Sequence, residues 1–419
     1  MDQPVPAPIR LDDLAAPRFS EEARAILDAG AALADDVELT PARLCADALD
    51  RSGGATDFGP DGWQEPLDVL CAALRDEAGL SRFGTVSMHA QLVQMLTNRL
   101  LVEQYLAEHP AALDRPVERP IVVAGLPRTG TTHLHNLLSA DPALRSLPYW
   151  EAVEPLPAPG EPTSGDASIT PRVDRCAFGL EMSRLWMPEM QRMHEMTPWH
   201  THEEIHLLAL DCSTLLFDTL APMPTWREHY RSSDQTRHYR YVYRVLQALQ
   251  HARGGQRWVL KSPQHLEQLG PLSTVFPDAT HVLTHRDPGD VTVSMVTMIV
   301  YAARMHLDRV DPIAISGYWQ DLLADLLTAC VRDRDLLPPG RSMDVRFDDF
   351  MSDELGVVAA AYALADQPLD QQAVGAHREY LATHQRNRHG AVIYEPERIG
   401  VDPAAVRARL ADYCERFGV

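Results

Sequence analysis

The sequence predicts an α/β fold, in which a parallel sheet is flanked by helices and follows a helical N-terminal subdomain. Four short segments are typical of buried strands, at 120–125, 257–261, 280–285 and 341–347. Long helical patterns separate these segments along the chain. Strands that alternate with helices form a parallel, helix-covered sheet. We therefore expect one α/β domain over residues 116–419.

Residues 1–115 are expected to form the helical subdomain. After an extended lead-in, Thr40 followed by Pro41 is typical of a helix N-cap with proline in the first turn. The stretch 87–110 has the amphipathic pattern of a long helix that ends at Pro110.

Composition and charge exclude several classes of protein. Hydrophobic residues make up 45% and charged residues 23% of the 419 positions, as in ordinary globular proteins. The net charge of −21 disfavours nucleic acid and anionic membranes as partners. The longest uncharged, mostly apolar run, 291–303, is shorter than the ~20 residues that span a bilayer. With six scattered cysteines, read as reduced thiols, we expect a cytoplasmic protein without stable membrane insertion.

The segment GLPRTGTTH at 125–133 predicts an anion-binding loop between a strand and a helix. Gly125 and Gly130 have the G-x-x-x-x-G spacing, which lets backbone N–H groups point at a phosphate beside a helix N-terminus. A nucleoside triphosphatase would continue with G-K-[ST], but here the cation is Arg128, inside the loop. The loop is therefore P-loop-like, and it favours a 5′-phosphate that bears a further acidic group.

This loop resembles that of sulfotransferases that use 3′-phosphoadenosine 5′-phosphosulfate (PAPS), in the bacterial branch with a helical N-terminal extension. The similarity runs from about residue 55 to the end. By this resemblance, the 5′ end of PAPS would contact Arg128, Thr129, Gly130, Thr131 and Thr132.

Two further segments resemble nucleotide-binding parts of the same family. THRDPGDVTVSM at 284–295 is similar to the segment that binds the 3′-phosphate, with Arg286 and Ser294 as the matching residues. HQRNRHGAVIY at 384–394 is similar to a late basic loop, which implies that Arg388, His389 and Gly390 contact the nucleotide. The product would be adenosine 3′,5′-bisphosphate (PAP).

Sulfuryl transfer needs positioned cations, because negative charge builds up on the bridging and equatorial oxygens. WVLKSPQHLEQL at 258–269 resembles the K-S-P segment of several sulfotransferases and puts Lys261 at the end of a predicted strand. Arg128 and Lys261 are the candidate catalytic cations. A sulfuryl group carries less charge than a phosphoryl group, so we expect no metal.

Three residues are candidates for the general base that takes the proton of the acceptor hydroxyl. Glu151 ranks first, because related sulfotransferases with a similar loop have a catalytic glutamate in this region. Glu203 is second, and His265, four residues after Lys261, is third. The Met- and Trp-rich stretch 180–200 suits a small, apolar, hydroxylated acceptor.

Three further interpretations of the sequence stay open. The stretch 203–220 is expected to be helical, and THEEIHLL at 201–208 has the H-E-x-x-H order of zinc hydrolases, with His202 and His206 as ligands. The anion-binding loop is also compatible with a P-loop nucleotide kinase or NTPase, and with a non-catalytic nucleotide-binding protein. The sequence leaves a homo-oligomer open.

Overall fold

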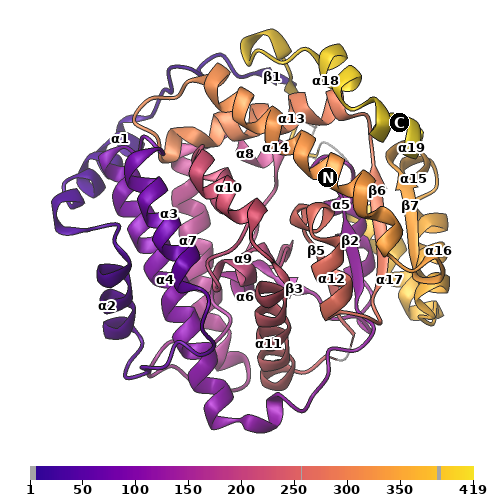
Figure 1. The fold of residues 1–419 in the computed structure, drawn as a ribbon, viewed down its shortest axis with the longest axis horizontal. Helices are drawn as coiled ribbons and strands as arrows, with labels where there is room; N and C mark the ends of the chain where they lie inside the picture. The colour runs from indigo at the N-terminus through magenta and orange to yellow at the C-terminus, as the bar shows by residue number, and fades with distance from the viewer. Residues whose placement is uncertain (1–5, 256, 385–387) are drawn as a thin grey trace.

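The computed structural model describes residues 6–255, 257–384 and 388–419. It confirms the α/β fold with a four-stranded parallel sheet in the order β5-β2-β6-β7 (Figure 1). The strands are β2 (Ile121–Ala124), β5 (Val259–Lys261), β6 (Thr280–His285) and β7 (Ser342–Arg346). The carboxyl ends of parallel strands lie at one edge of a sheet, so the segments that follow all four strands meet there.

Both faces of the sheet are covered, as the strand sequences require. In β2, Ile121 and Val123 join the cluster of apolar residues from α5 and α16, while Val122 and Ala124 join the larger cluster on the other face. Successive side chains of a strand point to opposite faces, so a strand buried on both faces must be apolar throughout. The helices, in chain order, are α1 (Glu21–Ala31), α2 (Pro41–Arg51), α3 (Gln64–Asp76), α4 (Arg82–Glu108), α5 (Thr131–Ser139), α6 (Tyr149–Val153), α7 (Thr170–Trp186), α8 (Met190–Met193), α9 (Ile205–Ala209), α10 (Pro224–Ser232), α11 (Thr236–Arg253), α12 (Leu269–Val275), α13 (Pro288–Ala302), α14 (Pro312–Asp333), α15 (Phe347–Ser352), α16 (Glu354–Ala365), α17 (Gln371–Thr383), α18 (Pro403–Arg409) and α19 (Ala411–Phe417).

The N-terminal helices α1 to α4 lie at one end of the molecule, away from the sheet (Figure 1). Thr40 caps α2 as expected, with its hydroxyl oxygen accepting the Arg43 N–H at 3.4 Å. The apolar cluster of α2, α3 and α4 also takes in residues between 209 and 230. This apolar core includes side chains from both sides of residue 115. The division of the chain at that residue stays a prediction.

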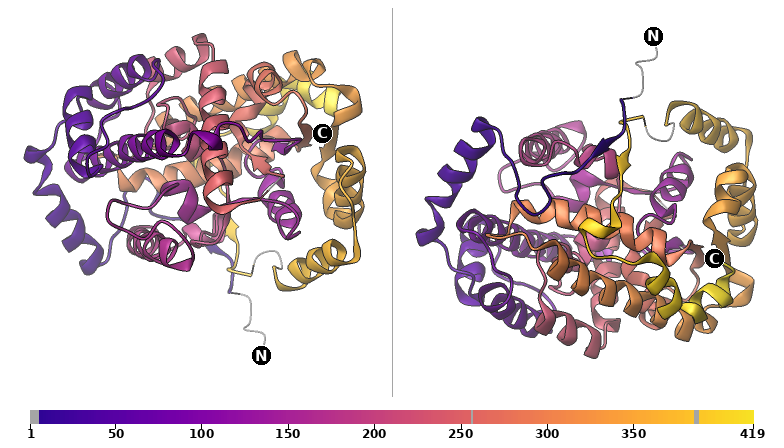
Figure 2. Two further views of the ribbon diagram at one scale, coloured as in Figure 1. Left: turned by 90° about the horizontal axis from the view of Figure 1, so that it is seen from below. Right: turned by 90° about the horizontal axis from the view of Figure 1, so that it is seen from above.

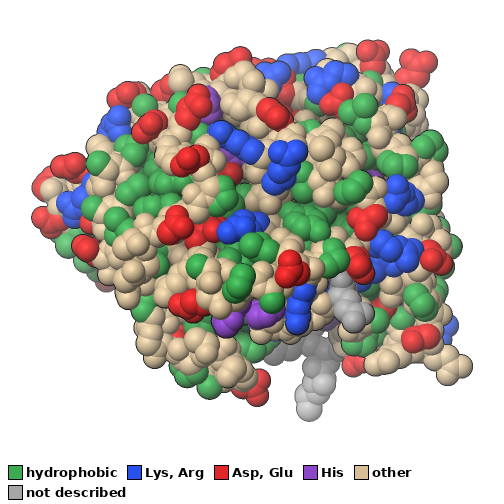
Figure 3. Space-filling view, turned by 60° about the horizontal axis from the view of Figure 1, so that its bottom comes forward, with side chains coloured by type: hydrophobic (Ala, Val, Ile, Leu, Met, Phe, Trp, Pro, Cys, Tyr) green, Lys and Arg blue, Asp and Glu red, His purple; other side chains and the backbone are tan. Residues whose placement is uncertain are grey.

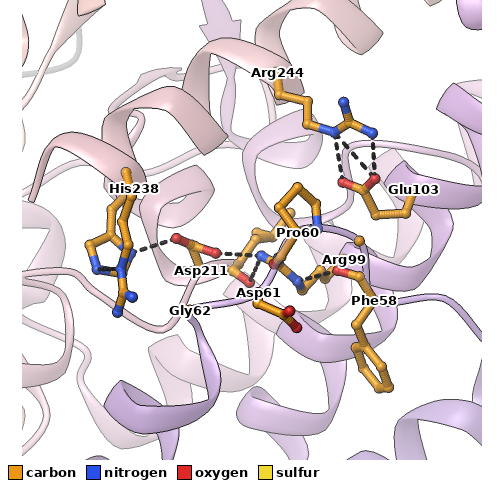
Figure 4. Close-up of polar contacts among 12 residues, drawn as sticks. Phe58, Pro60, Asp61, Gly62, Arg99, Glu103, Asp211, His238 and Arg244 are labelled. Atoms are coloured by element: carbon orange, nitrogen blue, oxygen red, sulfur yellow. Dashed lines mark hydrogen bonds and ion pairs between the residues drawn. The ribbon is translucent and has the colours of Figure 1, made fainter. Parts of the chain in front are cut away.

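A buried ion-pair network fastens α4 to the segment that follows α9 (Figure 4). Arg99 is fully buried and donates to Asp211 Oδ1 at 2.6 Å, while Asp211 Oδ2 pairs with His238 of α11 at 2.5 Å. Arg99 also donates to the carbonyl oxygens of Phe58 and Pro60. A buried guanidinium is stable only when its donors are satisfied, so this network fixes the position of the chain around residue 211.

Two small pairings bring distant segments together. β1 (Ile9–Arg10) pairs in parallel with β8 (Val392–Ile393), so the start of the described chain runs beside its late part (Figure 2). β3 (Leu147–Pro148) pairs antiparallel with β4 (Thr201–His202). This second pairing holds the segment before Glu203 against the chain that follows α5.

The expectation of one helix over 203–220 is wrong. Only α9 is α-helical there, and Cys212 follows it with φ at 53°, in the left-handed region. The chain turns at this point because Asp211 is held by Arg99 and His238. None of the helices in the described part of the chain combines the length and the hydropathy that a bilayer crossing requires.

Candidate active site

The loop between β2 and α5 has the geometry of an anion-binding turn. A side chain at Gly125 would put its Cβ 2.2 Å from Thr284 Oγ1, so only glycine fits. Gly130 caps α5 with φ at 88°, and Arg128 also has a positive φ of 73°. A positive φ strains a residue with a side chain, and such strain is typical of functional loops. α5 therefore starts at Thr131 with its first N–H groups free of helical partners.

Arg128 connects this loop to the segment predicted to bind the 3′-phosphate. Its Nε donates to Ser294 Oγ at 3.0 Å, and its Nη1 donates to the Met193 carbonyl at 2.5 Å. Arg286 Nη1 donates to the Arg128 carbonyl at 3.1 Å. The structure thus brings Arg128, Arg286 and Ser294 together, although the chain separates Arg128 from Ser294 by 166 positions.

The position of Arg286 follows from the β6–α13 turn. Arg286 comes directly after β6, and Asp287 caps α13 by accepting the N–H groups of Gly289 at 2.8 Å and Asp290 at 3.2 Å. Pro288 fits the first helical turn, which needs no N–H donor. Ser294 lies later on the same helix and faces back toward the loop. The Arg286 guanidinium also lies over the Phe347 ring, 4.4 Å from its centroid.

Lys261 ends β5 and is almost completely buried, with 2% of its surface exposed. It is the only lysine in the sequence, against 37 arginines. Its ammonium group forms an ion pair with Glu203, whose side chain is 18% exposed. The structure thus joins two of the predicted catalytic residues in one buried pair.

His265 lies in the short 3-10 helix Pro263–Glu267, which follows Lys261 closely in the chain, and both of its ring nitrogens have partners. Nε2 pairs with Glu204, and Nδ1 is hydrogen-bonded with the Tyr239 hydroxyl at 2.8 Å. Glu204 Oε2 also accepts the backbone N–H of Lys261 at 2.9 Å. His265 is thus engaged in a buried network rather than directed at a cavity.

Glu151 is paired with other residues than Lys261, Glu203 and His265. It is fully buried on α6, where Arg145 contacts both of its oxygens at 3.0 and 2.8 Å and Arg253 contacts one at 2.6 Å. Trp150, its neighbour, packs against the guanidinium groups of Arg172 and Arg253. These contacts are those of a buried ion-pair cluster.

A cavity of about 590 Å³ opens beside the anion-binding loop. Its walls come from the loop and α5, from the segment 193–200, and from α15 to α17. The lining includes Arg128, Gly130, Thr132, Arg286 and Arg388 from the predicted site, and Met193, His194, Trp199 and His200 from the Met- and Trp-rich stretch. Neither Lys261 nor Glu203 is among the residues that line this cavity. On the face of the molecule in Figure 3, acidic and basic side chains are interspersed with apolar ones.

Two histidines of the cavity wall that is formed by the segment 193–200 are neutral at physiological pH. Burial lowers the pKa of His200 to about 4, and the nearby Lys261 charge acts in the same direction. Burial also lowers the pKa of His194 well below its usual value, assisted by His200, Lys261 and Arg128. The Lys261 charge therefore reaches the side of the cavity, even though Lys261 itself is covered.

The late basic loop lies at the rim of the same cavity. Arg388 donates to both oxygens of Glu195 at 2.7 and 2.6 Å, and His389 pairs with Glu195 at 3.0 Å. Gly390 and Arg388 line an adjoining hollow of about 190 Å³. Residues 385–387 of this predicted segment lie outside the described residues.

The H-E-x-x-H segment does not form the helix that a zinc hydrolase needs. His202 lies in β4 and α9 begins only at Ile205, because the pairing with β3 holds the chain extended. His202 Nε2 and His206 Nδ1 are hydrogen-bonded to each other at 2.8 Å. Among the described residues, no group of three or more His, Cys, Asp or Glu side chains could hold a metal ion.

Sequence reasoning missed Glu204, and it covered His194, His200 and Arg192 only as part of the stretch 180–200, without naming them individually. Arg192 of α8 joins Arg128, Arg286 and Ser294 around a further hollow of about 550 Å³. Lys261 was predicted from the sequence, and the fact that it is the only lysine in the chain is a further sequence signal that marks this residue. For Glu204 there was no such signal, since its partners are 57 and 61 positions away.

The fold and the candidate site combine a parallel, helix-covered sheet with cations grouped around the predicted anion-binding loop. The sequence model of the sulfotransferase family matches residues 120–371, more than half of the chain. The chain therefore belongs to the sulfotransferase family, whose members transfer sulfuryl groups.

Solved structures extend the similarity to the N-terminal helices. Sulfotransferase STF9 from Mycobacterium avium is 28% identical with a TM-score of 0.79, and the match covers 92% of this chain and 98% of that one. Sulfotransferase STF1 from Mycobacterium tuberculosis H37Rv is also 28% identical, with a TM-score of 0.78 and coverage of 89% and 98%. Comparison with curated protein sequences gives no match.

Proposed function

We propose that the protein transfers a sulfuryl group from PAPS to a hydroxyl group of a small, apolar acceptor. The observation that carries this proposal is the contact between Arg128, Ser294 and Arg286, which joins the anion-binding loop to the predicted 3′-phosphate segment. A donor with phosphate groups at both the 5′ and 3′ positions needs cations in both places. The loop without a Walker lysine disfavours a triphosphate.

The 5′-phosphosulfate would bind at the start of α5, through the N–H groups of Gly130, Thr131 and Thr132 and the hydroxyls of the threonines. The 3′-phosphate would contact Arg286 and Ser294, with Arg388, His389 and Gly390 closing the rim. Thr129 stabilises the loop, because its hydroxyl donates to the Leu126 carbonyl at 2.6 Å and is hydrogen-bonded with the Thr284 hydroxyl at 2.7 Å.

Transfer would proceed in line. The acceptor oxygen attacks sulfur, the bond from sulfur to the bridging oxygen breaks, and PAP leaves. Arg128 and Lys261 would offset the charge that builds on the oxygens of the sulfuryl and leaving groups. No metal has a role in this proposal.

Glu203 is the base that the geometry supports best among the three candidates. Its carboxylate is partly exposed and lies against Lys261, whereas Glu151 and His265 are occupied by buried partners. The proton of the acceptor hydroxyl would pass to Glu203. Met193 and Trp199 would contact the apolar body of the acceptor.

Two measurements test the proposal. Thermal shift should show stabilisation by PAP and none by Mg·ATP, and the reverse result would favour a nucleotide kinase or NTPase. Transfer of ³⁵S from labelled PAPS to a panel of phenols and sterols should then give radioactive sulfate esters in a single turnover. PAP binding without any transfer would favour a non-catalytic nucleotide-binding protein.

A further inference from the structure

We propose that Glu204 is a positioning residue for catalysis, which fixes Lys261 through its backbone while Glu203 holds the Lys261 ammonium group. Two consecutive carboxylates thus contact one lysine from different sides. The proposal rests on the proposed function, because it takes Lys261 as the cation beside the transferred group.

The first argument is the position of Lys261 at the end of a strand. β5 is an edge strand, and its pairing with β2 stops at Val123 and Lys261. The Lys261 N–H donates to Glu204 Oε2 at 2.9 Å instead of to another strand. A charged acceptor makes a stronger hydrogen bond than a carbonyl oxygen, so Glu204 holds the open edge of β5 at its last residue and fixes the backbone from which the lysine side chain departs.

The second argument is the cost of burying this carboxylate. Glu204 is 2% exposed, and a buried charge is destabilising unless its partners satisfy it. Burial by itself would raise the pKa of Glu204, but the His265 imidazole and the hydrogen bonds to the carboxylate hold that pKa below its usual value. Glu204 is therefore ionised, and its two oxygens are bound to His265 and to the Lys261 backbone.

The third argument is the rigidity of the surrounding chain. Tyr239 of α11 fixes His265, and the Leu215 N–H donates to Gln264 Oε1 at 2.8 Å, beside His265 in the same turn. Beyond α9, the network of Asp211 with Arg99 and His238 holds the next turn of the chain. Glu204 is thus anchored from both directions, and any displacement of Glu204 is passed on to Glu203 and Lys261.

The single lysine makes a direct test feasible. Protein labelled with ¹⁵N-lysine has one backbone amide resonance, that of Lys261. Glu204→Ala removes the acceptor of this N–H, so the resonance should move upfield and its hydrogen exchange should become faster. The kcat for sulfuryl transfer should fall about 100-fold, the order expected for a misplaced catalytic group, while PAP affinity stays unchanged.

A conservative variant covers the case in which Glu204→Ala does not fold. The Glu204→Gln carboxamide can still accept the Lys261 N–H, so its amide resonance should stay near that of the wild type and kcat should be partly restored. Glu103→Gln is the matched control. Glu103 is likewise buried in an ion pair, with Arg244, and its loss should lower stability without moving the Lys261 resonance.

Some outcomes would overturn the proposal. An unchanged Lys261 resonance in Glu204→Ala, or wild-type kcat in that variant, excludes a positioning role. Equal loss of PAP affinity and kcat would indicate that Glu204 only supports the fold. If Lys261→Met transfers sulfuryl groups normally, the proposed function of Lys261 fails, whereas the Lys261 amide resonance, compared between the wild type and Glu204→Ala, still reports the contact with Glu204.

Discussion

The two sides of the cavity are built in different ways. The proposed donor side comes from two short strand–loop–helix segments, 121–133 and 280–294, in which each predicted site residue is close in sequence to the strand that positions it. The opposite side comes from the segment 193–200, and Glu203, which follows this segment, pairs with Lys261 58 positions away. Local geometry positions the anion-binding residues, whereas tertiary packing positions the proposed base. We therefore expect substitutions on the two sides to affect different steps.

The largest expected effect is on the acceptor side. Glu203→Gln keeps the shape of the side chain but removes its basicity, so kcat should fall about 10³-fold, within the range of general-base catalysis. PAP affinity, measured by calorimetry, should not change. Glu181→Gln, at an exposed position on α7, is the control and should behave like the wild type. A normal kcat in Glu203→Gln would remove this residue from the mechanism.

Glu151→Gln tests the other carboxylate. It leaves Arg145 and Arg253 without their anionic partner in a buried cluster, which should lower the free energy of unfolding by about 3 kcal/mol. Turnover per folded molecule should be retained. Denaturant unfolding and initial rates measured together separate the two effects. Lost turnover at unchanged stability would make Glu151 the base and reverse the contrast with Glu203.

Acid should lower the free energy of unfolding through His200, which lies on the proposed acceptor side of the cavity. Its pKa is about 4 in the folded protein against 6.5 for an ordinary histidine, so between these values the unfolded chain binds more protons. The free energy of unfolding is therefore unaffected by this group above pH 6.5 and decreases as the pH drops toward 4. At pH 5 the decrease from His200 alone is about 2 kcal/mol. His200→Gln should make the unfolding free energy less dependent on pH across this window. Identical pH profiles for both proteins would contradict the assignment.

The smallest expected effect is on the donor side. Arg286→Ala should weaken PAP binding by at least about 1.5 kcal/mol, since it removes a charge-assisted contact. Affinity for adenosine 5′-monophosphate, which lacks the 3′-phosphate, should stay the same. Equal losses for both nucleotides would mean that Arg286 does not contact the 3′-phosphate.

This contrast explains what the sequence could predict. The strands, the predicted anion-binding loop and the Asp287 cap depend on residues that are close in the sequence, so their patterns could be recognised there. The predicted fold is confirmed. The helix expected over 203–220 was wrong because Arg99, more than 100 positions away, holds Asp211 in a turn. The contacts of Glu204 were also out of reach, because nothing near it in the sequence marks His265 and the Lys261 backbone as its partners. The roles assigned to the site residues stay predictions.

The pairing of β1 with β8 has a consequence for the order of folding. The Arg10–Glu395 ion pair beside it joins residues 385 positions apart, and closing so long a loop costs about 5 kcal/mol in chain entropy. The hydrogen bonds of two paired residues in each strand cannot offset that cost alone. The pairing of β1 with β8 therefore forms only after the folded core has brought both segments together. The Ile9 N–H donates to the Ala391 carbonyl, next to Gly390. The rim of the proposed nucleotide site therefore takes its final form after the core has folded, and it draws on segments from both ends of the described chain.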